Sequence, residues 1–289
     1  MNGFAGLRVL ALESRRAPEF AKLISTYGGD PVVAPAMREV PLQTNTEALA
    51  FAADLLAAKY EMVIFLTGVG TRALLSVVET KYKRDDYLAA LQRVKVVARG
   101  PKPIAALREL GLTPAVTAPE PNTWRELLGA LDDAANSTPE FRLRGARIAV
   151  QEYGVSNPEL LSGLSERGAY VTPVPVYQWA LPLDLAPLRA AVQSLANGEI
   201  DVVFFTTGVQ ATHLFQVAAE MNLEAAMARG LYRAVIASIG PTTSEELHRR
   251  GIQADLEPTH PKMGFLVKEA AEQAAELLRR KRHGIAIST

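Results

Sequence analysis

The chain has 289 residues, of which 48% are apolar and 21% charged, and its 31 basic side chains balance 31 acidic ones. This length favours roughly two domains, and the zero net charge gives no electrostatic footprint for a nucleic acid partner. Cysteine is absent from the sequence, which excludes disulfides, zinc–thiolate sites and thiol nucleophiles.

The amino-terminal segment, residues 1–13, lacks the basic flank and apolar core of a secretory signal. No apolar run in the sequence reaches the ~20 residues that a membrane-spanning helix needs. We therefore expect a cytoplasmic protein without a membrane partner.

In chain order, short runs rich in valine and isoleucine alternate with helical patterns, which predicts an α/β fold with parallel sheets. The runs are continuously apolar, as strands covered on both faces must be. Five strands are predicted in the first part of the chain, at 8–12, 32–36, 62–66, 94–98 and 113–117, and five in the second part, at 147–151, 170–176, 202–206, 234–238 and 253–256.

The two sets of strands belong to a repeat. Most matching residues are separated by 140 positions, and an offset one residue shorter aligns Gly6 with Gly145. So many matches at one offset, with glycines and prolines at the turns, indicate an internal duplication rather than a general likeness between two α/β domains. The residues that recur identically 140 positions later are Pro18, Gly28, Pro35, Phe65, Thr67, Gly68, Val69, Leu74, Gly100, Pro101, Leu107 and Gly111.

Each copy contains an apolar run that meets a threonine–glycine turn and then a helical pattern. Thr67 and Gly68 form this turn in the first copy, and Thr207, Gly208 and Val209 form it in the second. Such a turn presents free backbone N–H groups at the start of a helix, where they can bind an anion. Two such turns indicate a polyanionic ligand.

A second pair of turns follows the next strand of each copy, at residues 100–103 and 240–244. In the later turn, Thr242 with Glu245, or Thr243 with Glu246, has capping-box spacing, so simple helix capping is one interpretation. Ligand binding is compatible with it, because one cap does not satisfy every free N–H group of a helix start.

A nucleotide cofactor is the main alternative for the first turn, because residues 68–73 loosely fit the pattern G-x-G-x-x-G/A. That pattern requires an acid at the end of the next strand, where this chain has Arg99 and Gly100. The second copy has Gln210 in place of Gly70. No Walker sequence is present, and the four histidines lack metal-ligand spacing, so we expect neither cofactor nor metal.

The two copies differ where the second strand ends, at residues 36–41 and 176–182. Met37 in the first copy corresponds to Tyr177 in the second. A duplicated scaffold repeats its packing but needs its chemistry only once, so this difference makes Tyr177 a candidate catalytic residue. An aromatic plug at a strand end is the alternative.

Three features together resemble the uroporphyrinogen-III synthase (HemD) family of tetrapyrrole biosynthesis, and the resemblance extends from Gly6 to Leu278. They are the duplicated strand, turn and helix, the Val176-Tyr177-Gln178 segment at the end of a strand, and the turn at 239–243. No single motif is specific, but the ordered set is. The resemblance implies two flavodoxin-like domains with parallel five-stranded sheets, joined by a two-stranded hinge linker. Domain 1 would comprise 1–37 and 182–289, domain 2 would comprise 38–177, and the linkers would lie near 37–41 and 177–182.

The activity implied by the resemblance is a lyase reaction, the cyclisation of hydroxymethylbilane with loss of water and inversion of the last pyrrole ring. It proceeds without cofactor or metal, in a monomer that makes at most transient contact with hydroxymethylbilane synthase. The linear tetrapyrrole carries acetate and propionate groups, which the anion-binding turns could hold without a positive net charge.

The resemblance also implies roles for individual residues. Tyr177 would be the acid that assists departure of the hydroxyl group, since a phenol is protonated at neutral pH. Residues 13–16 fit only loosely the Thr-Arg-Pro turn of many members, which leaves the role of Arg15 open. The expected substrate contacts are Thr67, Gly68, Thr207, Gly208, Val209, Thr242 and Thr243, with Lys102, Arg15 and Lys262 as charges near the carboxylates.

Two other functions stay open at this point. A duplicated α/β protein with a hinge could be a non-catalytic two-domain module that binds or senses a small molecule. A family member that has lost its activity could also serve as a fused or regulatory partner.

Overall fold

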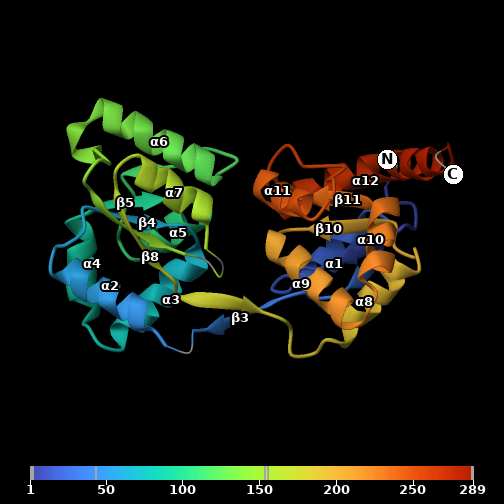
Figure 1. Cartoon of the computed structure of the whole chain (residues 1–289), viewed down its shortest axis with the longest axis horizontal. Coiled ribbons are helices and arrows are strands. Elements are labelled where there is room, and N and C mark those ends of the chain that lie inside the picture. Colours follow the sequence, from blue (N-terminus) through green and yellow to red (C-terminus); the bar gives the residue numbers. More distant parts are fainter. Residues whose placement is uncertain (1–2, 43, 153, 155, 288–289) are drawn as a thin grey trace. The chain divides into compact units, whose positions relative to one another are not determined.

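The computed structural model describes residues 3–42, 44–152, 154 and 156–287, and the chain divides into two compact units. Unit 1 comprises Met1–Arg38 with Ala180–Thr289, and unit 2 comprises Glu39–Trp179. Each unit is built around its own parallel sheet, with helices on both faces (Figure 1). In the described part of the chain, no helix is both long and apolar enough to cross a bilayer.

The sheet of unit 1 combines strands from distant parts of the chain in the order β11-β10-β1-β2. All neighbouring strands in this sheet run parallel. The strands are β1 Arg8–Ala11, β2 Asp30–Val33, β10 Val202–Phe205 and β11 Val235–Ser238, and the helices are α1 Ala17–Thr26, α8 Ala186–Ala196, α9 Gly208–Glu220, α10 Glu224–Arg233, α11 Pro241–Arg249 and α12 Met263–Ile287.

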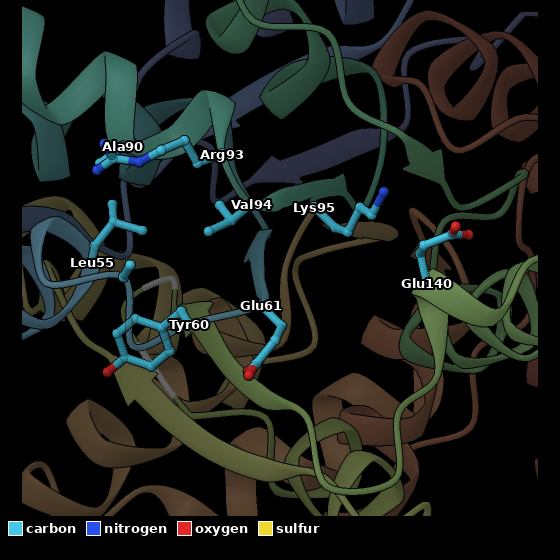
Figure 2. Close-up of a pocket in the computed structure, with 9 residues that line it drawn as sticks. Leu55, Tyr60, Glu61, Ala90, Arg93, Val94, Lys95 and Glu140 are labelled. Atoms are coloured by element: carbon cyan, nitrogen blue, oxygen red, sulfur yellow. The ribbon is translucent and has the colours of Figure 1, made fainter.

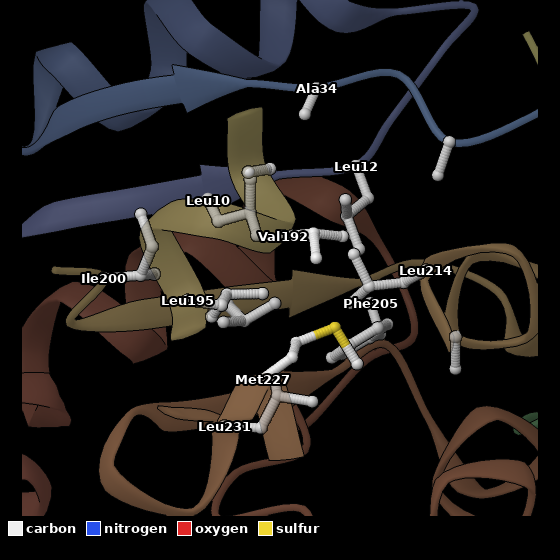
Figure 3. Close-up of a cluster of buried hydrophobic side chains, with 14 of the residues drawn as sticks. Leu10, Leu12, Ala34, Val192, Leu195, Ile200, Phe205, Leu214, Met227 and Leu231 are labelled. Carbon is white, nitrogen blue, oxygen red and sulfur yellow. The ribbon is translucent and has the colours of Figure 1, made fainter. Parts of the chain in front are cut away.

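Strand β10 shows why continuous apolar sequence forms the centre of this sheet. All four of its residues are buried. Val203 and Phe205 face a cluster that includes side chains of α8, α9 and α10 (Figure 3), whereas Val202 and Phe204 face α1 and α12. Each face is covered, so every residue of the strand gains from burial rather than alternate ones only.

The sheet of unit 2 has five parallel strands in the order β6-β5-β4-β7-β8. Its central strand, β4, is again buried along its whole length. The strands are β4 Met62–Phe65, β5 Lys95–Ala98, β6 Val116–Thr117, β7 Arg147–Gln151 and β8 Tyr170–Val174, and the helices are α2 Thr46–Leu56, α3 Gly68–Glu79, α4 Arg84–Gln92, α5 Pro101–Glu109, α6 Trp124–Ser137, a short 3₁₀ turn η1 Pro139–Phe141 and α7 Pro158–Glu166.

The two faces of the unit 2 sheet are covered by different helices. Val63 and Phe65 of β4 pack into a cluster with residues of α2, α3, α4 and α5. Met62 and Ile64 pack on the other face with residues of α6 and α7. This three-layer arrangement leaves the ends of the strands, rather than the faces of the sheet, as the places where a ligand can approach.

Two strand predictions for unit 1 were wrong. The strand expected at 253–256 is only an isolated bridge between Ala237 and Leu256, because the N–H of Ile236 donates to the Asp255 carboxylate at 2.7 Å instead of to a strand carbonyl. The unit 1 sheet therefore has four strands, not the five expected. With this bridge counted, its order is the flavodoxin-like 2-1-3-4-5.

The second strand starts earlier than expected, at Asp30, and ends at Val33 rather than at residue 36. Its register with β1 pairs Arg8 with Asp30 and Ala11 with Val33. Hydrogen bonds to the β1 side continue beyond it, from the N–H of Ala34 to the carbonyl of Ala11 and from the N–H of Ala36 to the carbonyl of Leu12, but the second is one residue out of register, so the regular ladder ends.

The two segments expected as linkers each contain a short strand. These strands, β3 Arg38–Pro41 and β9 Tyr177–Ala180, pair with each other in a separate two-stranded sheet. The Arg38 guanidinium Nε also donates to the carbonyl of Leu181 at 3.0 Å. The side chain of Tyr177 is thereby placed at the first residue of a strand rather than in an irregular loop.

Candidate functional site

Each sheet has one point from which successive strands are added outward in opposite directions, which we call the reversal point. In unit 1 the chain passes from β1 outward to β2, while β10 and β11 lie on the other side of β1. In unit 2 the corresponding point lies between β4 and β7. Open α/β sheets bind ligands outside the carboxyl ends of the strands at such reversals. The Thr67 turn follows β4 and the Thr207 turn follows β10, so each turn borders the reversal of its own unit.

The Thr67 turn has the geometry of an anion-binding helix start. Thr67 is the N-cap of α3, in extended conformation, and its hydroxyl oxygen accepts from the N–H of Gly70 at 3.0 Å. Among the described residues, no hydrogen bond from the N–H of Gly68 or Val69 to a backbone acceptor outside its helix is found. These two groups, with the positive end of the helix dipole, are available to a carboxylate.

Tyr177 lies next to this turn. Its hydroxyl oxygen is 3.4 Å from the Thr67 hydroxyl oxygen, and its side chain is buried. Its ring packs edge-on against Trp179, with centroids 5.4 Å apart. Trp179 in turn contacts Gly154, where an added Cβ would lie 2.2 Å from the indole. The structure therefore brings together two of the residues selected from the sequence, Thr67 and Tyr177, within one unit.

The second turn of unit 2 is in contact with the first. A Cβ added at Gly68 would lie 2.5 Å from the carbonyl oxygen of Lys102, so only glycine permits this approach. Gly100 is the N-cap of α5, and Lys102 lies exposed in the first turn of that helix. Thr67, Gly68 and the backbone of Lys102 thus lie together at the carboxyl ends of the unit 2 strands.

An exposed ion pair also ties α3 to α5. Arg72 donates from Nη2 and Nε to the two carboxylate oxygens of Glu109, at 2.6 and 2.9 Å, and from Nη1 to the carbonyl of Gly68 at 3.3 Å. The hydrogen bond from Arg72 lowers the pKa of Glu109, and the same bond raises the pKa of Arg72. Arg72 therefore stays charged beside the turn.

In unit 1, the turn at Thr207 contacts helix α11 beyond its first turn, through Glu246. Thr207 is the N-cap of α9, with Gly208 and Val209 in its first turn. A Cβ added at Gly208 would lie 2.7 Å from the Glu246 side chain on α11. The first turn of α11 carries Thr242, which is exposed, and Thr243, which is buried.

The capping box expected at the start of α11 is absent. The N-cap of α11 is Gly240, without a side-chain cap. The helix begins at Pro241, whose fixed φ suits the first helical position, and this places Thr242 and Thr243 inside the helix rather than before it. The carbonyl of Gly240 accepts from the N–H of Thr243 and of Ser244 instead.

The two remaining basic residues selected from the sequence both belong to unit 1. Arg15 is exposed in the segment that follows β1, and Lys262 is exposed just before α12. The carbonyl of Lys262 accepts from the N–H of Leu266 at 3.0 Å, so the backbone of Lys262 stands at the start of that helix.

Four polar residues beside the turns were not predicted from the sequence as part of the site. Gln151 and Gln210 are both fully buried. Glu13 accepts from the Thr206 hydroxyl at 2.8 Å, and Glu152, which is 8% exposed, accepts from the Ser156 hydroxyl at 2.7 Å. The repeat could have indicated the two acids, because the shift that aligns Gly6 with Gly145 also aligns Glu13 with Glu152.

A cavity of about 320 Å³ in unit 2 lies at the amino-terminal ends of strands β4 and β5, opposite to the ends that carry the turns (Figure 2). Its charged lining is mixed in sign, and Glu61 is already engaged as the acceptor of the Arg147 N–H at 2.6 Å. This cavity borders no helix start of the kind described above, so we do not assign it to the candidate site. The residues that line it include Leu55, Tyr60, Glu61, Arg93, Val94, Lys95 and Glu140.

In the parts of the chain that the structure describes, no three histidine, aspartate or glutamate side chains gather closely enough to hold a metal ion. The groups that the candidate site offers are backbone N–H groups, hydroxyls, one phenol and a few charged side chains. They can bind carboxylates and donate a proton.

Known proteins with similar sequences match this chain along most of its length. The Bacillus subtilis (strain 168) protein described as "Uncharacterized protein YjjA" is 32% identical over 278 residues, which cover 95% of this chain and 98% of that protein. A "Putative uroporphyrinogen-III synthase" of Methanothermobacter thermautotrophicus is 27% identical over 83% of this chain and 87% of its own.

Among solved structures, a mutant uroporphyrinogen III synthase of Thermus thermophilus has a TM-score of 0.67 to this chain at 24% identity, covering 94% of this chain and 99% of its own. That likeness concerns the fold. The profile of the family described as uroporphyrinogen-III synthase HemD matches residues 18–268 of this sequence. The chain therefore belongs to the uroporphyrinogen-III synthase HemD family.

Proposed function

We propose that the protein is a uroporphyrinogen-III synthase, a lyase that cyclises hydroxymethylbilane with loss of water and inverts its last pyrrole ring. The observation that carries the proposal is the helix start that follows the central strand of each unit, at the carboxyl end of that strand beside the reversal point, with a second helix packed against it. A linear tetrapyrrole bears carboxylates along its whole length, and N–H groups at helix starts bind carboxylates.

Substrate binding is assigned to both pairs of turns. In unit 2, carboxylates would be bound by Thr67, Gly68 and Lys102. In unit 1, they would be bound by Thr207, Gly208, Val209, Thr242 and Thr243, with weaker contributions from Arg15 and Lys262. Holding the two ends of a flexible linear molecule in place lowers the entropic barrier to ring closure, which is the main difficulty of this reaction.

Tyr177 is the proposed acid that assists departure of the hydroxyl group. Its hydroxyl lies beside Thr67, so a substrate held at that turn would have the phenol within reach. Packing against Trp179 fixes the ring. The reaction as proposed needs no cofactor or metal, since the leaving group is water and the new bond joins two carbons of the substrate.

The domain organisation proposed from the resemblance has one domain of 1–37 and 182–289 and a second of 38–177, derived from an internal duplication, with linkers at 37–41 and 177–182 acting as a hinge. The protein would work as a cytoplasmic monomer that receives its labile substrate in transient contact with hydroxymethylbilane synthase.

The test is to supply the purified protein with freshly generated hydroxymethylbilane, oxidise the products and separate the uroporphyrin isomers. Isomer III is expected. Isomer I, which forms by ring closure without inversion in the absence of enzyme, must be reduced at the same time. Formation of isomer I alone, at the rate seen without protein, would contradict the proposal.

A second candidate, a non-catalytic module that binds or senses a small molecule, is favoured by one observation. Glu13 and Glu152 each place a carboxylate next to the strand ends, where it repels a carboxylate ligand. In that case the protein would bind a ligand with hydrogen-bond donors and turn over nothing. An unchanged isomer ratio, together with binding of a ligand that offers hydrogen-bond donors and no binding of the carboxylate-rich uroporphyrinogen III, would favour this alternative.

A further inference from the structure

The two threonine–glycine turns are supported from inside the fold by one buried glutamine each, although the two glutamines come from different elements. Gln210 is the third residue of helix α9 in unit 1. Gln151 is the last residue of strand β7 in unit 2. Both side chains are completely buried, and a buried amide must be fully hydrogen-bonded to be tolerated.

In unit 1, Gln210 holds the end of strand β10. Its Oε1 accepts from the N–H of Thr206 at 2.7 Å and of Thr207 at 3.3 Å. Its Nε2 donates to the Thr206 hydroxyl oxygen at 2.9 Å. The N–H groups of Thr206 and Thr207 are thus both satisfied by one side chain at the start of helix α9.

In unit 2, Gln151 does the same from the neighbouring strand. Its Oε1 accepts from the N–H of Thr67 at 3.3 Å, and its Nε2 donates to the carbonyl of Glu152. The residue at the third position of α3, where unit 1 has Gln210, is Gly70. Conversely, the buried Leu12 follows β1 at the position where unit 2 has Gln151.

The two arrangements exclude each other within one unit. A Cβ added at Gly70 would lie 2.0 Å from Nε2 of Gln151, and such a contact forces one of the two groups to move. The second glycine of the Gly68-Val69-Gly70 sequence is thereby explained by the amide that packs on it, not by a nucleotide phosphate. Each unit has one glutamine and one small or apolar residue, in opposite places.

We propose that Gln151 and Gln210 are positioning residues, which act on the substrate only through the turns at Thr67 and Thr207 that they hold. The assignment rests on the proposed function for its substrate, but the support of the turn itself does not. Because the amide oxygen fixes the N–H of the cap residue, its loss lets the first turn of the helix shift, and a carboxylate then binds more weakly.

The experiment builds the unit 1 arrangement into unit 2. Three proteins are compared with the wild type: Gln151→Leu, the double variant Gln151→Leu with Gly70→Gln, and Gln92→Leu as a control at an exposed site of α4. Hydroxymethylbilane turnover gives KM and kcat, amide hydrogen exchange reports on Thr67, and thermal unfolding reports on stability. In unit 1, the Gln210 amide also donates to the Thr206 hydroxyl oxygen. Unit 2 has Leu66 at the corresponding position, so Gly70→Gln can restore only the amide oxygen that accepts from the turn.

For Gln151→Leu we expect KM to rise about tenfold with little change in kcat, and exchange at Thr67 to become faster. The double variant should recover most of both losses, and the control should match the wild type. An unchanged KM in Gln151→Leu, or a double variant no better than the single one, would overturn the inference.

The two proposals fail in different ways. If the wild type does not cyclise hydroxymethylbilane, the proposed function fails, and the same variants are compared by their affinity for uroporphyrinogen III and by exchange at Thr67. Restoration of both by Gly70→Gln would still support the positioning role. Faster exchange in Gln151→Leu that Gly70→Gln does not reverse would refute it.

Discussion

Replacing Tyr177 with phenylalanine tests the chemistry assigned to unit 2 with the smallest possible change. The substitution removes one oxygen, which lies 3.4 Å from the Thr67 hydroxyl oxygen, and leaves the ring on Trp179. A contact of this length is a weak hydrogen bond, and its loss should lower the free energy of unfolding by about 0.5–1 kcal/mol. Any larger effect on catalysis must then come from the lost proton donor.

The expected loss in kcat is about 10²-fold, at the lower end of what general acids contribute, because the hydroxyl group of the substrate leaves readily. KM should change little, since the turns that hold the carboxylates are untouched. Initial rates of uroporphyrinogen III formation provide both constants. Tyr60→Phe is the matched control, because Tyr60 is a tyrosine of unit 2 with the same 6% exposure, at the opposite edge of the sheet. An unchanged kcat in Tyr177→Phe would remove this residue from the mechanism.

Two further substitutions test the binding site and the fold. Gly68→Ala places a Cβ 2.5 Å from the Lys102 carbonyl oxygen and should push the two turns of unit 2 apart. We expect KM to rise about tenfold. A KM equal to that of the wild type would show that the contact is irrelevant to binding. Asp255→Ala removes the carboxylate that accepts from the Ile236 N–H and that pairs with the Lys281 ammonium group at 2.6 Å. The side chain of Asp255 is only 16% exposed and that of Lys281 only 20%. Urea unfolding should show a loss of roughly 2 kcal/mol, and a change below about 0.5 kcal/mol would contradict the importance of this contact.

The central strands could be predicted from the sequence because their signal is local. Residues 62–66 and 202–205 are continuously apolar and lead to a threonine–glycine turn, and the structure has β4 and β10 there. Burial on both faces leaves no polar positions, so the strands stand out in the sequence. The repeat then indicated the corresponding helix starts, since turns need the same glycines and prolines in both copies.

The edges of the sheets depend on partners that the sequence does not reveal. The strand expected at 253–256 is lost because the Asp255 side chain, rather than a backbone carbonyl, takes the N–H of Ile236. The pairing of β3 with β9 joins segments that are far apart in the chain. Such contacts are decided by tertiary packing, not by local preference.

The candidate site was predictable in its backbone but not in its supporting side chains. Thr67 and Tyr177 were selected separately and lie together in the structure. Gln151 was missed because its role depends on a neighbouring strand and on the empty space at Gly70. The repeat hides this relationship, because the two copies place the same amide on different elements.

The measurement that tests the central claim most directly is the isomer composition formed from a large molar excess of hydroxymethylbilane over protein. An enzyme must convert many equivalents, so isomer III should dominate and its rate of formation should rise in proportion to protein concentration. A binding module could affect at most one equivalent. Isomer I as the main product at every protein concentration would contradict the assignment as a synthase.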